Sequence, residues 1–85
     1  MREFHYTITD AEGIHARPAG ELVKLAKEFS CDIKMSSGGK EGDCKRIFGI
    51  MGLAVKQGMD VKMSFDGEDE DKACEEIEAF MKENM

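Results

Sequence analysis

A histidine and an arginine two residues apart offer the clearest chemistry in this chain. They are His15 and Arg17, within the stretch EGIHARPA at residues 12–19. A neutral imidazole is a nucleophile, and a guanidinium presents a planar fork of donors that fits phosphate oxygens. The pair therefore indicates a site that holds a phosphoryl group, either bound or attached covalently to the imidazole ring.

Pro18 indicates where this pair lies in the fold. Proline is tolerated in the first turn of a helix, because its missing N–H would have no partner there. The apolar residues that follow recur at helical spacing and predict a helix from about residue 16 to residue 29. His15 then lies at or just before the first turn, where free backbone N–H groups and the helix dipole favour a bound anion and a neutral imidazole.

Length and charge limit the classes of protein to which the chain can belong. Its 85 residues predict a single domain, residues 1–85, with one small core. The net charge is −6, and this argues against a nucleic-acid partner, because such a protein needs a basic face. No apolar run is long enough to span a bilayer, and the N-terminal stretch alternates like a strand without a signal-peptide core. We therefore expect a cytoplasmic protein without membrane insertion.

The three cysteines, Cys31, Cys44 and Cys74, have no C-x-x-C spacing. An odd number without a disulfide framework indicates a reducing compartment and free thiols. We interpret them as small buried hydrophobes rather than as metal ligands or redox groups. We expect no metal site in the chain.

Alternating and helical patterns predict seven elements. Strands are expected over residues 4–8, 31–35 and 61–65, with a short, weak strand over 40–44 after a turn at 36–39. Helices are expected over 16–29 and 47–55, and a last one begins within 68–71. Because each helix has one apolar side, the order βαββαβα predicts an α+β protein with one antiparallel sheet and helices on one face. His5 falls on the polar side of the first strand, where we expect a solvated surface residue.

Two local features suggest a surface for a partner. The segment 47–55 is too apolar for one helical face, so we expect some of Ile47, Phe48 and Met51 to be exposed; the alternative, that all three are core, stays open. Gly20 inside the first helix costs about 1 kcal/mol relative to alanine. Close approach of a partner would explain it, but so would tight packing or drift.

Residues 13–19, GIHARPA, resemble the active-site motif of the HPr family, the histidine-containing phosphocarriers of the sugar phosphotransferase system. Residues 45–58, KRIFGIMGLAVKQG, resemble the segment around the second helix of that family, and residues 60–67 with the acidic last helix also fit. The resemblance covers essentially the whole chain. It implies an open-faced β-sandwich, in which three helices lie on one face of a four-stranded antiparallel sheet.

The resemblance also implies a function. His15 would accept a phosphoryl group from enzyme I, which phosphoenolpyruvate phosphorylates, and pass it to enzyme IIA domains in sugar uptake. The chain would be a phosphoryl carrier rather than a turnover enzyme, a monomer that needs no cofactor. In the family the bond is to Nδ1, Arg17 matches the arginine that stabilises the phosphoryl group, and the backbone N–H groups of Ala16 and Arg17 complete the cradle. The positions implied for partner docking are Gly20, Lys24, Lys27, Ile47, Phe48 and Met51.

Two residues depart from the family pattern. Arg46 stands where many relatives from Gram-positive bacteria carry a serine that an ATP-dependent HPr kinase phosphorylates, so we predict that this chain escapes that switch. Arg46 also opposes the helix dipole and removes a serine cap worth typically about 1 kcal/mol. Glu12 replaces a small polar residue. If its carboxylate faces the ring it favours the protonated imidazole and repels a phosphohistidine, and if it points away it does neither.

These departures keep a second function open. It is a regulatory HPr-like paralogue that binds partner proteins, a transcriptional regulator among them, without efficient sugar-linked phosphotransfer. Retention of both His15 and Arg17 favours the carrier. A third hypothesis, a small ferredoxin-like binding module with a chance H-x-R-P, does not explain why Arg17 and Pro18 stand beside a histidine at a helix start.

Overall fold

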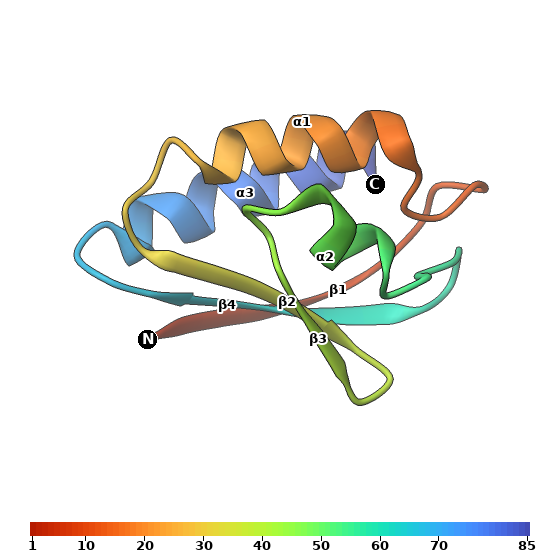
Figure 1. The fold of residues 1–85 in the computed structure, drawn as a ribbon, viewed down its shortest axis with the longest axis horizontal. Helices are drawn as coiled ribbons and strands as arrows, with labels where there is room; N and C mark the ends of the chain where they lie inside the picture. Colours follow the sequence, from red (N-terminus) through yellow and green to blue (C-terminus); the bar gives the residue numbers. More distant parts are fainter.

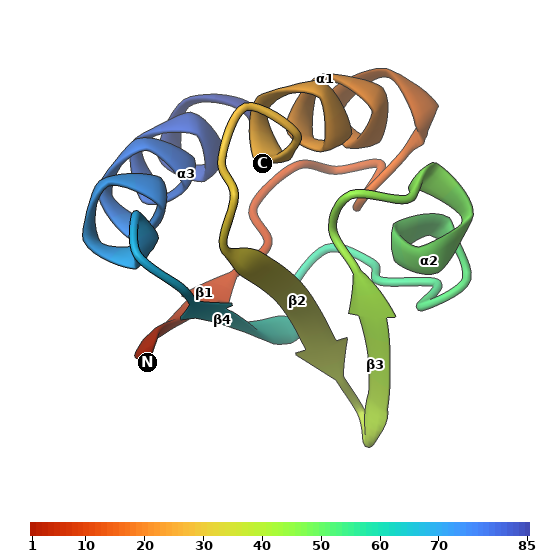
Figure 2. The ribbon, with the colours of Figure 1, turned by 60° about the vertical axis from the view of Figure 1, so that its left-hand side comes forward.

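One sheet and three helices make up the computed structural model, which describes residues 1–85. The strands form one sheet in the order β1-β4-β2-β3, and every neighbouring pair is antiparallel. All three helices lie on one side of this sheet and leave its other face open (Figures 1 and 2). The elements are β1 (Arg2–Thr7), α1 (Ala16–Ala26), β2 (Asp32–Ser37), β3 (Lys40–Asp43), α2 (Ile47–Met51), β4 (Asp60–Asp66) and α3 (Glu70–Asn84). The predicted order and the open-faced sandwich are confirmed.

Alternation in the central strands explains why the sheet has one buried face. In β4, Val61, Met63 and Phe65 are buried beneath the helices, whereas the residues between them are partly exposed. β1 is an edge strand, and its Phe4 is only half-buried, with its ring stacked on Phe65 at 5.8 Å between centroids. His5 lies on the exposed side of β1, as predicted.

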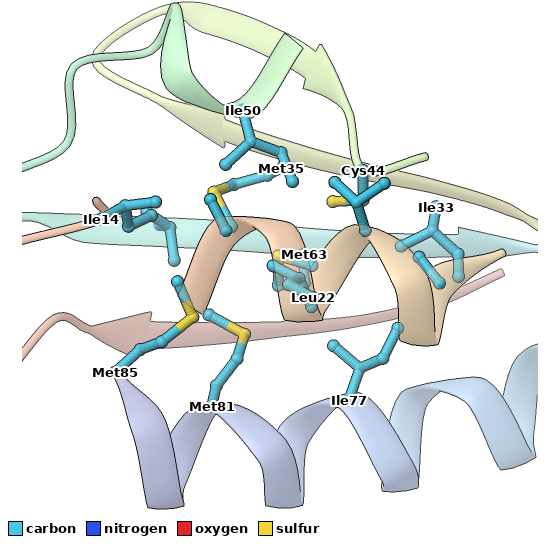
Figure 3. Close-up of a cluster of buried hydrophobic side chains, with 14 of the residues drawn as sticks. Ile14, Leu22, Ile33, Met35, Cys44, Ile50, Met63, Ile77, Met81 and Met85 are labelled. Atoms are coloured by element: carbon cyan, nitrogen blue, oxygen red, sulfur yellow. The ribbon is translucent and has the colours of Figure 1, made fainter. Parts of the chain in front are cut away.

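The core is a single cluster of 22 buried residues between the sheet and the helices. From α3 and the residue after it, Ile77, Met81 and Met85 point toward the sheet (Figure 3). The three cysteines are free and buried, as predicted, and burial raises the pKa of the Cys44 thiol to about 12. A thiol with that pKa is not a thiolate at neutral pH, so Cys44 packs as a small hydrophobe.

Several element ends differ from the sequence predictions, and contacts distant in sequence explain the first of them. α1 ends at Ala26 rather than at residue 29. Beyond it, the carboxylate of Asp69 accepts the backbone N–H groups of Ser30 and Cys31 at 2.8 and 2.9 Å. This contact holds the chain in the turn that leads into β2.

α2 and the hairpin also differ from the prediction. α2 stops at Met51 rather than at residue 55, because Gly52 caps it and Ala54 has a positive φ of 51°. β2 continues to Ser37, which pairs with Lys40, so the hairpin turn is confined to residues 38 and 39 rather than 36–39. None of the three helices has the length and apolarity needed to cross a bilayer.

Candidate functional site

His15 is the N-cap of α1. Its backbone is extended, with φ −113° and ψ 176°, and its carbonyl accepts the Ala19 N–H at 3.0 Å, while its side chain makes no capping hydrogen bond. The side chain is 34% exposed, so the ring lies outside the core and within reach of another protein. Pro18 is buried in the first helical turn. The predicted place of the histidine at the helix start is confirmed.

A tight loop brings the chain to His15. The Oδ1 atom of Asp10 accepts the Glu12 N–H at 2.9 Å, and the Asp10 carbonyl accepts the Gly13 N–H at 2.9 Å. The next residue, Ile14, donates its N–H to the Val55 carbonyl at 3.0 Å. Gly13 has a φ of +69°, and a Cβ there would lie 2.5 Å from that same carbonyl oxygen, so only glycine fits the crossing.

The end of α3 ties down the beginning of this loop. The Met85 carbonyl accepts the N–H groups of Thr9 and Asp10 at 2.7 and 3.1 Å, and the side chain of Met85 is buried in the core. On the other side, the Gln57 side-chain amide donates to the Thr9 carbonyl at 3.1 Å. The loop that leads to His15 is therefore held from several elements before α1 begins.

Two carboxylates face the same nitrogen of the ring. The Nε2 atom of His15 lies 3.4 Å from Oε2 of Glu12 and 3.8 Å from Oδ2 of Asp10. Glu12 therefore points toward the ring, the orientation that the sequence left open. Carboxylates beside Nε2 favour a proton on that nitrogen, so the lone pair of the neutral ring is left on Nδ1.

Arg17 and His15 line one shallow pocket. Its volume is about 260 Å³, and Asp10, Pro18, Glu21 and Asn84 also line it. In a helix that begins at Ala16, the N–H groups of Ala16 and Arg17 have no acceptor within the helix. The pocket thus combines a nucleophile, a guanidinium and unpaired amides, and this combination can receive a phosphoryl group. The sequence analysis missed Asp10, Glu21 and Asn84 at this site, and the only signal for Asp10 was its place two residues before Glu12.

The apolar residues of α2 divide between core and surface. Ile50 is fully buried, whereas Phe48 is 87% exposed and Met51 is 37% exposed. Ile47 is half-buried against the core. The expected exposure of part of this segment is confirmed, and the alternative that all of Ile47, Phe48 and Met51 are core is wrong. Their role in docking stays a prediction.

One predicted docking position on α1, Gly20, lies beside Ile47 of α2. Lys24 and Lys27 are exposed, and Gly20 is partly exposed. A Cβ built at Gly20 would have the Cδ1 atom of Ile47 as its nearest neighbour, at 3.8 Å, which is ordinary van der Waals contact. Tight packing therefore does not require glycine at this position. Close approach of a partner and evolutionary drift remain as explanations of Gly20.

Arg46 lies at the start of α2 with its side chain 82% exposed. Its Nε atom is 3.9 Å from Oδ2 of Asp43, and it makes no capping hydrogen bond. Asp43 instead organises this turn, because its Oδ1 accepts the Lys45 N–H at 2.9 Å and its carbonyl accepts the Arg46 N–H at 3.0 Å. Asp43 thus orders the turn before α2, while the first turn of the helix has no side-chain cap.

Comparison with known proteins identifies the family to which this site belongs. Residues 2–83 match the family model described as the PTS HPr component phosphorylation site. The chain belongs to the HPr family. This HPr-family chain is 41% identical over 83 residues to the phosphocarrier protein HPr of Lysinibacillus sphaericus, covering 98% of this chain and 94% of that relative.

Solved structures of HPr-family proteins share the fold. A histidine-containing phosphocarrier protein of a mycoplasma superposes with a TM-score of 0.94 at 38% identity, covering 96% of this chain and 93% of that chain. The Bacillus subtilis catabolite repression protein Crh superposes with a TM-score of 0.78 at 35% identity, covering 94% of this chain and 92% of that one. That Crh structure is described as a dimer with a swapped domain.

Proposed function

We propose that this chain carries a phosphoryl group on His15, accepts it from phosphorylated enzyme I and delivers it to enzyme IIA in sugar uptake. One observation carries the proposal: the imidazole is partly exposed at the N-cap of α1, in the same pocket as Arg17. We also propose that the chain acts in the cytoplasm as a monomer, where the α2 surface around Phe48 is free to meet successive partners.

The geometry supports Nδ1 as the accepting nitrogen. The two carboxylates hold a proton at Nε2, so the Nδ1 lone pair attacks phosphorus while the bond from phosphorus to the donor protein breaks. Arg17 and the N–H groups at the start of α1 stabilise the charge on the transferred oxygens. The reverse sequence of events, with enzyme IIA as acceptor, delivers the group.

Glu12 and Arg46 are the observations that favour the second candidate, a regulatory paralogue. A carboxylate beside the ring adds negative charge near an incoming phosphoryl group. Arginine at position 46 offers no hydroxyl for a serine kinase. In this second function the chain binds partner proteins, with a transcriptional regulator as one class, and passes on little phosphate.

A labelling experiment tests the two functions. The chain is mixed with enzyme I and labelled phosphoenolpyruvate, and we expect acid-labile label on His15 that leaves when enzyme IIA is added. The chain offers a matched control, because His5 is its only other histidine and is exposed on β1. His15→Ala should abolish labelling, and His5→Ala should retain it. Label that stays on the chain favours the regulatory function, and no label at all contradicts the carrier.

A further inference from the structure

Three ligand atoms converge where the loop before α1 meets the helix. Nε2 of His15 lies 3.4 Å from Oε2 of Glu12 and 3.8 Å from Oδ2 of Asp10. Single ligand atoms of all three residues lie within 4.8 Å of one another. Imidazole nitrogen and carboxylate oxygen are both ligands of Zn²⁺, each at about 2.0–2.2 Å, so two ligands of a tetrahedral site stand about 3.4 Å apart. The two distances from Nε2 are close to this edge length, and the carboxylate oxygens lie within 4.8 Å of each other.

The charge around these atoms also points to a cation. Neither Asp10 nor Glu12 has a lysine or arginine nitrogen within 4.0 Å, and each makes its ionic contact with the ring of His15 alone. The two carboxylates therefore share one imidazole ring as their ionic partner, which leaves at least one negative charge without a side-chain cation within 4.0 Å. A divalent ion bound among the three atoms would neutralise both carboxylates.

The loop holds the ligands ready for such an ion. The second oxygen of Asp10, Oδ1, accepts the Glu12 N–H at 2.9 Å, so Oδ2 is the one turned toward the ring. The backbone at both ends of the loop is fixed by Met85 and Val55. The backbone and the Asp10 carboxylate are thus already ordered, whereas the Glu12 side chain is 74% exposed and is left for the metal to order. Exposure of the site leaves a coordination position for water.

We propose that Asp10, Glu12 and His15 form a site for a divalent transition metal of the Zn²⁺ type, and that the bound ion withdraws His15 from phosphoryl transfer. From the sequence we expected no metal site in the chain. The regulatory part rests on the proposed carrier function. The ion takes the Nε2 lone pair, so the one proton of the neutral ring moves to Nδ1, and no lone pair is left to attack phosphorus.

Binding is tested first, without enzyme I. Zinc chloride is titrated into the full chain in a phosphate-free buffer, and calorimetry is combined with NMR of the histidine ring protons. We expect one zinc per chain, a shift of the His15 signals and no shift of the His5 signals, all reversed by a chelator. Asp10→Asn and Glu12→Gln should each weaken binding at least about tenfold, and His5→Ala should leave it unchanged. Zinc binding of equal strength in both carboxylate variants, or shifts at His5 instead of His15, would overturn the site.

Regulation is tested next, with labelled phosphoenolpyruvate and enzyme I. Zinc should block labelling of the wild-type chain at a concentration that still permits labelling of Glu12→Gln, and this comparison separates an effect on the carrier from one on enzyme I. Zinc binding that leaves wild-type labelling unchanged overturns the regulatory part. Absence of label without zinc contradicts the carrier function instead, and the binding result stands apart from it.

Discussion

Substitution of Gly20 tests whether α1 lacks a side chain at this position so that a partner can approach the helix closely. In Gly20→Ala the new methyl group would lie 3.8 Å from Cδ1 of Ile47 and meet nothing closer. Alanine is more favourable than glycine in a helix interior by about 0.5–1 kcal/mol, so the variant should be more stable by this amount, with no clash to offset it. For a domain of this size, that gain raises the midpoint of thermal unfolding by roughly 3–6 °C. Unfolding followed by circular dichroism measures the shift.

The same variant separates the two explanations that remain for this glycine. If enzyme I or enzyme IIA approaches α1 closely, Gly20→Ala should raise the apparent KM of phosphoryl transfer although the protein has become more stable. Ala79→Gly is the matched control, because Ala79 is exposed within α3. It should lower stability by a similar amount and leave transfer unchanged. A lower midpoint for Gly20→Ala would refute the packing argument, and an unchanged KM would leave drift as the explanation.

Three further predictions follow from particular contacts. Glu12→Ser should accept the phosphoryl group about threefold faster near 0.1 M salt, because it removes a charge roughly 6–7 Å from two phosphoryl charges, worth about 0.6 kcal/mol after screening. Initial rates that match the wild type at every salt concentration would remove Glu12 from the account. Incubation with HPr kinase and ATP should give no phosphoserine by mass spectrometry, whereas Arg46→Ser should restore an acceptor; stoichiometric phosphoserine on the wild-type chain would contradict this. The backbone N–H groups of Ser30 and Cys31 lower the pKa of Asp69, so its stabilising effect is complete above the unfolded-state pKa of about 3.9 and is lost as the pH falls through the lower folded-state pKa. Denaturant unfolding of Asp69→Asn should therefore depend less on pH below about 4 than that of the wild type, and identical pH dependence would be the contrary result.

The elements were predictable where burial alone dictates the pattern. Val61, Met63 and Phe65 alternate because one face of β4 meets the core, and this regularity is local to the sequence. The ends of α1 and α2 were not predictable in the same way. The turn after α1 is held by Asp69, which lies 38 and 39 residues away from its two partners. A pattern within a short stretch of sequence cannot predict a contact between residues this far apart.

The candidate site shows the same division. Pro18 fixes the first turn of α1 by its own covalent structure, so the place of His15 could be predicted from neighbouring residues. The direction of Glu12 could not, because it depends on the loop that Asp10 closes and on the hydrogen bond from Ile14 to Val55. Side-chain direction in a loop is set by tertiary contacts, and residue type alone does not reveal it.

The crossing of Gly13 over Val55 joins the reactive loop to the segment that leaves α2. The Ile14 N–H donates to the Val55 carbonyl at 3.0 Å, so the backbone just before His15 is tied to the segment that follows α2. Under the proposed function, a partner that docks on the α2 surface around Phe48 would bring its phosphorus toward the ring, so that recognition would also provide the alignment that in-line transfer requires. Successive partners of such a carrier would need to share only this one binding surface.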